Sequence, residues 1–154
     1  MKKQRIYVDT SVIGGCFDKE FEKWSNGLFR DFEEQSFLPV ISTVTDIEIS
    51  KAPQYVQDKY LELKSNNAEV LQVDKEIEEL ASMYIKRKIV SKKFIDDATH
   101  IALATVANVD LLVSWNFKHI VHFEKIRLFN SVNLELGYGK INIYSPREVT
   151  TYAE

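Results

Sequence analysis

The sequence predicts an α/β protein with a mostly parallel central sheet and helices on both faces. Short β-prone runs alternate with helix-like segments along the 154 residues, and strands separated by helices pair in parallel. The length suits one domain, which we expect to span residues 1–154. No internal repeat, low-complexity stretch or Gly-, Pro- or Ser-rich linker divides the chain.

The periodicity of apolar residues sets the expected elements. Strands are predicted over residues 5–8, 37–42, 70–73, 110–114 and 141–144, and helices over 19–34, 43–50, 54–64, 75–87, 94–107 and 123–136. We expect Gly14 and Gly15 to break the chain after the first strand, and Pro146 to open a short terminal turn.

Composition and charge exclude several classes of protein. The hydrophobic fraction of 45% and charged fraction of 28% are typical of a soluble globular chain. No apolar run approaches the ~20 residues of a transmembrane helix, so we expect no membrane association. The only cysteine, Cys16, precludes an internal disulfide, which fits the cytoplasm, and argues against a zinc site. The net charge of -3 is not that of a passive nucleic-acid binder, so an RNA partner would require local basic residues or bound metal.

An acidic residue follows the first predicted strand. Asp9 stands directly before Thr10 and Ser11. In parallel sheets, ligands bind beyond the carboxyl ends of the strands, so Asp9 is a candidate functional residue. The alternative is a helix cap or turn at the end of the strand.

Two further acids lie on the apolar stripes of predicted helices. Glu48 shares the inward stripe of helix 43–50, where a carboxylate needs a partner or a cation. Asp97 lies on the same stripe as Ile101, although stabilisation of the helix start by its dipole is an alternative. We expect Asp96 and His100, four residues apart, to form a surface ion pair.

A polar cluster follows the strand predicted over 110–114. The amide oxygen of Asn116 is a possible ligand for a hard cation, and a simple turn is the alternative. Lys118 and His119 come next, and we expect them to contact a substrate phosphate. Trp115 is expected to pack against the site rather than to stack on a base.

Three carboxylates and one amide, each at a strand end or at the start of the next helix, favour a hard-cation site. Oxygen-only ligands select Mg²⁺ or Mn²⁺ over zinc. Crowded carboxylates repel one another unless a cation neutralises them. A site of this kind activates water and stabilises phosphate charge during in-line attack.

In this order, the motifs resemble the PIN-domain family, and within it the VapC-like toxins of toxin–antitoxin pairs. The matching stretches are YVDTSV, ISTVTDIEIS, DDATHIALA, LLVSWNFKHI and the terminal SPREV, which together cover nearly the whole chain. The ordered set is more specific than any one stretch.

The resemblance implies a PIN fold and a Mg²⁺- or Mn²⁺-dependent endoribonuclease. It assigns Asp9, Glu48 and Asp97 as metal-binding acids and Thr10 or Ser11 as a supporting hydroxyl. It further implies RNA as substrate and a small antitoxin protein as partner, and we expect a homodimer.

One position departs from the family pattern. Asn116 stands where the family often has a fourth aspartate, which weakens the expected hold on a second metal. The alternative function is therefore a PIN-fold protein that binds RNA or a partner with weak or no catalysis. Two other classes fit less well. A receiver domain needs paired acids near its first strand, and a haloacid-dehalogenase-like phosphatase needs Asp-x-Asp, which Asp9-Thr10-Ser11 lacks.

Overall fold

A single parallel sheet organises the computed structural model, which describes residues 2–152. The strands are β1 (Arg5–Val8), β2 (Leu38–Ser42), β3 (Glu69–Leu71), β4 (Leu111–Val113) and β5 (Ile143–Tyr144), in the order β3-β2-β1-β4-β5. All four neighbouring pairs run parallel, which confirms the predicted fold class. Residues 1, 153 and 154 of the predicted domain lie outside the described range, and the extent of that domain stays a prediction.

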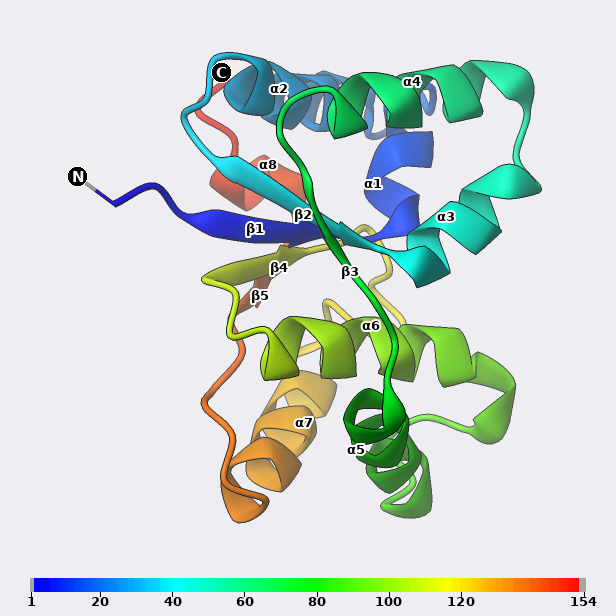
Figure 1. The fold of residues 1–154 in the computed structure, drawn as a ribbon, viewed down its shortest axis with the longest axis vertical. Helices are drawn as coiled ribbons and strands as arrows, with labels where there is room; N and C mark the ends of the chain where they lie inside the picture. The colour runs from blue at the N-terminus through cyan, green and yellow to red at the C-terminus, as the bar shows by residue number, and fades with distance from the viewer. Residues whose placement is uncertain (1, 153–154) are drawn as a thin grey trace.

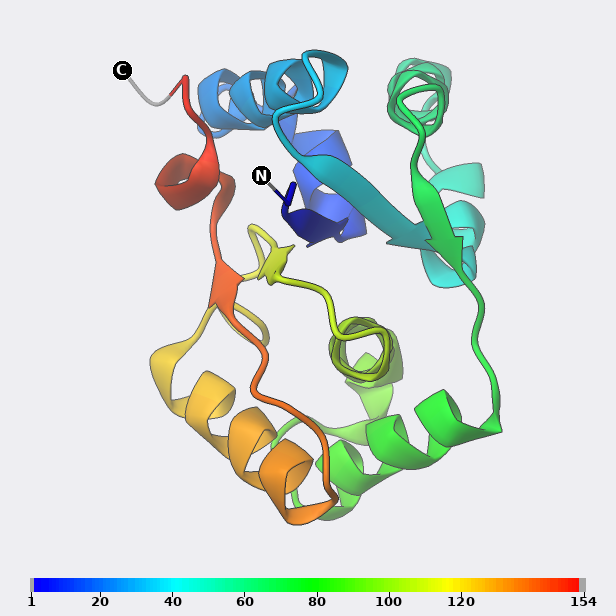
Figure 2. The ribbon, with the colours of Figure 1, turned by 60° about the vertical axis from the view of Figure 1, so that its left-hand side comes forward.

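Helices cover both faces of the sheet (Figure 1). The helices are α1 (Thr10–Gly15), α2 (Glu22–Glu33), α3 (Thr43–Ser50), α4 (Gln54–Lys64), α5 (Lys75–Lys86), α6 (Ile95–Val106), α7 (Phe123–Glu135) and α8 (Pro146–Val149), with a 3-10 turn η1 (Lys92–Phe94) before α6. Figures 1 and 2 place α1, α2, α4 and α8 on one face and α5, α6 and α7 on the other. Within the described part of the chain, no helix is long and apolar enough to cross a membrane.

Side-chain alternation along the central strand divides the core into two parts. Ile6 and Val8 pack with α1, α2 and α4, whereas Tyr7 packs with α5, α6 and α7. Successive residues of a strand point to opposite faces, so the three fully buried residues of β1, Ile6, Tyr7 and Val8, serve both layers. The strand order reverses beside β1, since β2 and β4 flank it from different parts of the chain. This reversal marks the sheet edge where parallel folds bind ligands.

The predicted breaks after β1 were wrong. Gly14 and Gly15 lie inside α1, which starts at once after the strand, and the next helix begins at Glu22 rather than at residue 19. The predicted strands over 70–73 and 141–144 are also displaced or shortened, to Glu69–Leu71 and Ile143–Tyr144. The glycine pair therefore forms the last turn of α1, which ends at Gly15, and close packing requires a glycine at position 15.

A Cβ atom on Gly15 would lie 2.7 Å from both Ser25 Oγ and Trp115 Nε1, whereas one on Gly14 would meet nothing within 4 Å. Trp115 Nε1 donates a 2.8 Å hydrogen bond to Ser25 Oγ, so the extra methyl would separate two bonded groups. We expect Gly15→Ala to lower the free energy of unfolding by about 1–3 kcal/mol. Gly14→Ala is the matched control and should raise it by roughly 0.5–1 kcal/mol. Urea unfolding of the two variants tests this, and equal effects would refute the packing argument.

Candidate active site

Asp9 lies at the carboxyl end of the central strand and is only 4% exposed. It N-caps α1 and also accepts hydrogen bonds from Ser11 Oγ at 2.6 Å and from Ser114 Oγ at 2.5 Å. Burial raises the pKa of Asp9, while the positive charge of His100 and the two hydroxyl donors oppose that rise. Asp9 therefore caps α1 and remains a candidate functional residue at the same time.

Glu48 projects from α3 toward the sheet end of α6. Its Oε1 accepts hydrogen bonds from Thr10 Oγ1 at 2.8 Å and from His100 Nε2 at 2.7 Å. The other ring nitrogen of His100, Nδ1, lies 2.6 Å from Tyr7 Oη in β1. The Tyr7 hydroxyl is in turn 2.8 Å from Ser42 Oγ, at the end of β2. One histidine thus connects β1, α3 and α6.

The expected Asp96–His100 ion pair is wrong. His100 is buried and pairs with Glu48, while Asp96 stays exposed. The inward direction of His100 follows from its position three residues after Asp97 and one before Ile101, on the buried side of α6. This spacing was the signal in the sequence that could have placed His100 beside Glu48 and Asp97.

Asp9, Glu48 and Asp97 are here called the acidic cluster. Glu48 contacts His100 directly, and the charges of all three acids act on its ring. Burial disfavours the charged imidazole, but the hydrogen bond to Glu48 and the charges of all three acids outweigh it and raise the pKa of His100. Burial would likewise raise the pKa of Glu48, yet His100 and Thr10 together lower it. The charged form of His100 is therefore favoured by acids from three elements, of which it contacts Glu48 directly.

Asp97 has a second partner in the loop after β4. Its Oδ2 lies 2.9 Å from His119 Nδ1, and the His119 ring packs on Phe94 with centroids 4.0 Å apart. His119 is 7% exposed, so its contact with Asp97 makes it a positioning residue for that acid. Contact of His119 or Lys118 with a substrate phosphate stays a prediction.

Asn116 organises this loop. Its Oδ1 accepts a 2.9 Å hydrogen bond from the His119 backbone N–H, and its own N–H donates to Ser114 Oγ at 2.9 Å. Ser114 Oγ then donates to Asp9. Asn116 thus has the turn role that was given as its alternative, and it is linked to the acidic cluster only through Ser114. Ser114, which the sequence analysis did not single out, is the direct link.

Trp115 is packed as predicted. It is 7% exposed and stacks on Phe21 with ring centroids 4.2 Å apart. The aromatic ring exposed in this loop is instead Phe117, at 49%. Base stacking by Trp115 would require opening this packing.

The donor atoms suit a hard cation, although their spacing is not that of a formed metal site. All are oxygens, and among described residues Oε2 of Glu48 and Oδ1 of Asp97 accept no hydrogen bond. Within residues 2–152, no group of three or more His, Cys, Asp or Glu side chains is spaced to hold a metal ion. Glu48 and Asp97 are each bonded to a different histidine, which keeps their carboxylates apart. The predicted ligand set of Asp9, Glu48 and Asp97 therefore remains a prediction.

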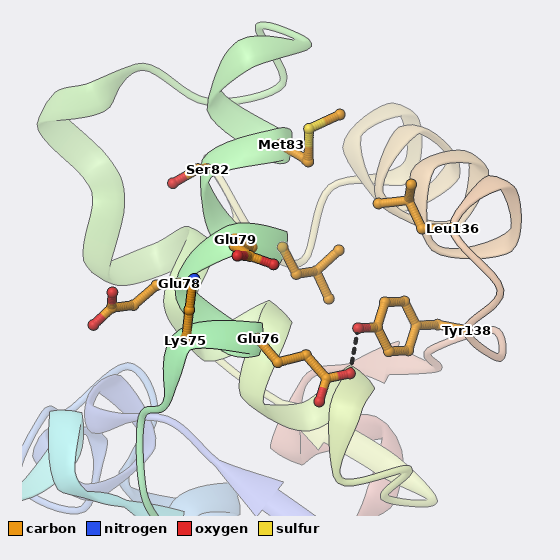
Figure 3. A pocket seen from close by; sticks show the side chains of 9 residues that line it. Lys75, Glu76, Glu78, Glu79, Ser82, Met83, Leu136 and Tyr138 are labelled. Carbon is orange, nitrogen blue, oxygen red and sulfur yellow. Dashed lines mark hydrogen bonds between the residues drawn. The ribbon is translucent and has the colours of Figure 1, made fainter.

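A separate groove of about 710 Å³ lies between α5 and the segment after α7. Its rim carries Glu76, Glu78 and Glu79, and its apolar wall includes Met83 and Leu136 (Figure 3). Tyr138 closes one end with a 2.5 Å hydrogen bond from its hydroxyl to Glu76. The groove shares no residue with the acidic cluster.

Comparison with known proteins identifies the architecture. No protein-family model matches the sequence, and no curated protein matches it. A chain of a toxin–antitoxin complex from Klebsiella pneumoniae is similar in structure, with a TM-score of 0.55 and 17% identity over 74% of this chain and 88% of that one. A chain of VapBC2 from Rickettsia felis, bound to a DNA fragment from their promoter, gives a TM-score of 0.57 and 16% identity over 92% of this chain and 98% of that one.

The fold is PIN-like. The structural similarity to VapC-type PIN domains that the ordered motifs predicted is confirmed at the level of the fold. In this PIN-like sheet, the acidic cluster lies at the carboxyl ends of the strands, beside the reversal of strand order. This is the position at which open parallel sheets bind their ligands.

The His100 network predicts a pH-dependent contribution to stability. The raised pKa of His100 means that its stabilisation is full below the unfolded value of 6.5 and is lost as pH rises through the folded value. The lowered pKa of Glu48 means that its contribution is lost only in acid, below 4.5. We expect His100→Gln to destabilise the protein by on the order of 1–3 kcal/mol near pH 6 and by less near pH 9. Urea unfolding in EDTA at both pH values measures this, and a pH-independent difference would contradict it.

Proposed function

We propose that this protein is a Mg²⁺- or Mn²⁺-dependent endoribonuclease. The observation that carries the proposal is the gathering of Asp9, Glu48 and Asp97 around His100 at the carboxyl end of a PIN-like sheet. Buried and partly buried carboxylates are costly unless paired, and among the described residues the basic groups within ion-pair distance of these three acids are two histidines, His100 and His119. A divalent cation would neutralise the remaining charge.

Each residue has a defined part in this proposal. Asp9, Glu48 and Asp97 would bind the cation, which when bound would supply a water nucleophile and stabilise phosphate charge. Thr10 and Ser11 hold the Glu48 and Asp9 carboxylates through hydrogen bonds of 2.8 and 2.6 Å. His119 orients Asp97. These contacts fix the direction of each acid before substrate arrives.

The proposed partners follow from the similar structures. Both belong to toxin–antitoxin assemblies, so we propose that this chain is the toxin of such a pair, with a small antitoxin protein as partner and RNA as substrate. We also propose a homodimer and a cytoplasmic location. Mass measurement of the purified protein, alone and co-expressed with the product of a neighbouring gene, tests the assembly.

Replacement of one acid tests the proposed activity. We expect Asp97→Asn to reduce metal-dependent RNA cleavage at least 100-fold, because removal of a charged metal ligand costs several kcal/mol of transition-state stabilisation. Asp96→Asn is the matched control, since Asp96 is adjacent, exposed and outside the cluster. Cleavage of single-stranded RNA in Mg²⁺ and in Mn²⁺ is the measurement. Equal activity of the two variants would remove Asp97 from the site.

The alternative function is RNA or partner binding with weak or no catalysis. It is favoured by Asn116, whose amide oxygen caps the turn to His119 instead of facing a free position. RNA binding by the parent protein without cleavage at any metal concentration would select this alternative.

Asn116→Asp separates the two functions. Aspartate retains the oxygen that accepts from His119 and is nearly isosteric, so the fold should be unchanged. The added charge lies next to Ser114, which binds Asp9, and should strengthen metal binding. We expect about a tenfold gain in Mn²⁺ affinity, equivalent to ~1.4 kcal/mol, and faster cleavage at low metal. Calorimetry and a metal titration of cleavage test this. No change in either quantity would show that Asn116 lies outside the metal site.

A further inference from the structure

Two lysines from separate segments of the chain lie near one aromatic ring, Phe94, beside the acidic cluster. Lys93 Nζ lies 5.7 Å from the centroid of Phe94, and Lys118 Nζ lies 5.9 Å from the same centroid. Lys93 comes from η1, before α6, and Lys118 from the loop after β4. Two separate segments of the chain thus each place a cation close to the same phenyl ring.

The charges of this lysine pair are not neutralised within the protein. Both residues are exposed, and neither forms an ion pair among residues 2–152. Two ammonium groups near one ring repel each other, and the quadrupole of a single exposed phenyl ring offers each only about 0.5–1 kcal/mol. An anion between them would relieve that repulsion.

The lysine pair is also connected to the proposed catalytic acids. Phe94 packs on His119 with ring centroids 4.0 Å apart, and His119 Nδ1 contacts Asp97 Oδ2 at 2.9 Å. The lysine pair is therefore linked to Asp97 through the Phe94 and His119 rings. Its charge is opposite in sign to that of the acidic cluster.

We propose that Lys93 and Lys118 form a phosphate-binding subsite that holds the backbone of single-stranded RNA next to the acidic cluster. The subsite rests on the proposed ribonuclease function, but its binding step does not require catalysis. An acidic chain with a net charge of -3 repels a polyanion, and local cations at the edge of the site overcome that repulsion. Lys93 adds a second phosphate contact to the one predicted for Lys118. The ring of Phe94 stabilises both ammonium groups through cation–π contacts.

The test is binding of a fluorescein-labelled single-stranded RNA, about ten nucleotides long, by anisotropy in EDTA, where metal-dependent cleavage is absent. Loss of one phosphate contact lowers the salt dependence of log affinity by about 0.7 for a single strand, which is about fivefold in affinity at 0.1 M salt. We expect this from Lys93→Gln and from Lys118→Gln. The double variant should lose about 25-fold and about 1.4 in slope.

Lys140→Gln is the matched control. Lys140 is exposed, precedes β5 and thus lies at the amino ends of the parallel strands, opposite to the end that carries the acidic cluster, and it forms no ion pair within the described residues. The Lys140→Gln substitution changes the net charge by the same amount as Lys93→Gln or Lys118→Gln. Because Lys140 lies outside the subsite, the RNA affinity should stay within about twofold of the parent value. Equal losses in all three single variants, no loss in any, or no binding by the parent protein would overturn the subsite.

Cleavage by the same variants separates this inference from the proposed function. If Asp97→Asn abolishes cleavage while the lysine variants bind RNA like the parent, the ribonuclease stands and the subsite fails. If the lysine variants lose binding and no variant cleaves RNA, the subsite stands and the catalytic proposal fails.

Discussion

The charged imidazole of His100 is the interaction on which the arrangement of the site depends. It is buried between Glu48 and Tyr7, and the charges of Asp9, Glu48 and Asp97 raise its pKa. Without it, carboxylates from three elements would repel one another at a site where Asp9 is buried and Glu48 and Asp97 are only partly exposed. Because Tyr7 belongs to the central strand, this compensation is anchored in the most buried part of the sheet. The site and the core are therefore stabilised by the same contact.

The two layers of the molecule contribute differently to the site. The layer of α1 and α3 supplies Glu48 and the hydroxyls of Thr10 and Ser11, while α6 and the loop after β4 supply Asp97, His100 and His119. In the sheet between them, Asp9 follows β1 and Ser114 follows β4, and the hydrogen bond from Ser114 to Asp9 joins these two strand ends. A cation would have to compete with these internal partners, so metal binding and loosening of the histidine contacts are coupled. The lysine pair lies against Phe94, whose ring packs on His119.

Much of the fold was predictable because local patterns and tertiary packing agree. The helices over Thr43–Ser50 and Gln54–Lys64 have the predicted bounds, with Ser42 capping the first and Pro53 preceding the second. The failures are instructive. Gly14 and Gly15 suggested a break directly after β1, yet α1 includes both and ends at Gly15, since Asp9 caps its start and Gly15 fits against Ser25 and Trp115. The residues around Gly15 in the sequence do not indicate that Trp115, which is distant in the chain, packs against it.

By itself the sequence determined the parallel α/β architecture, the strand-end positions of Asp9 and Asn116, and the inward direction of Glu48 and Asp97, because periodicity fixes which face a residue occupies. Only the tertiary structure decided the partners. It turned His100 from an expected surface ion pair into the buried centre of the acidic cluster, joined Asp97 to His119, and brought Lys93 to Lys118 across Phe94. These contacts join residues 22 to 93 positions apart, and their distances follow from how helices dock on the sheet, which no short-range pattern encodes.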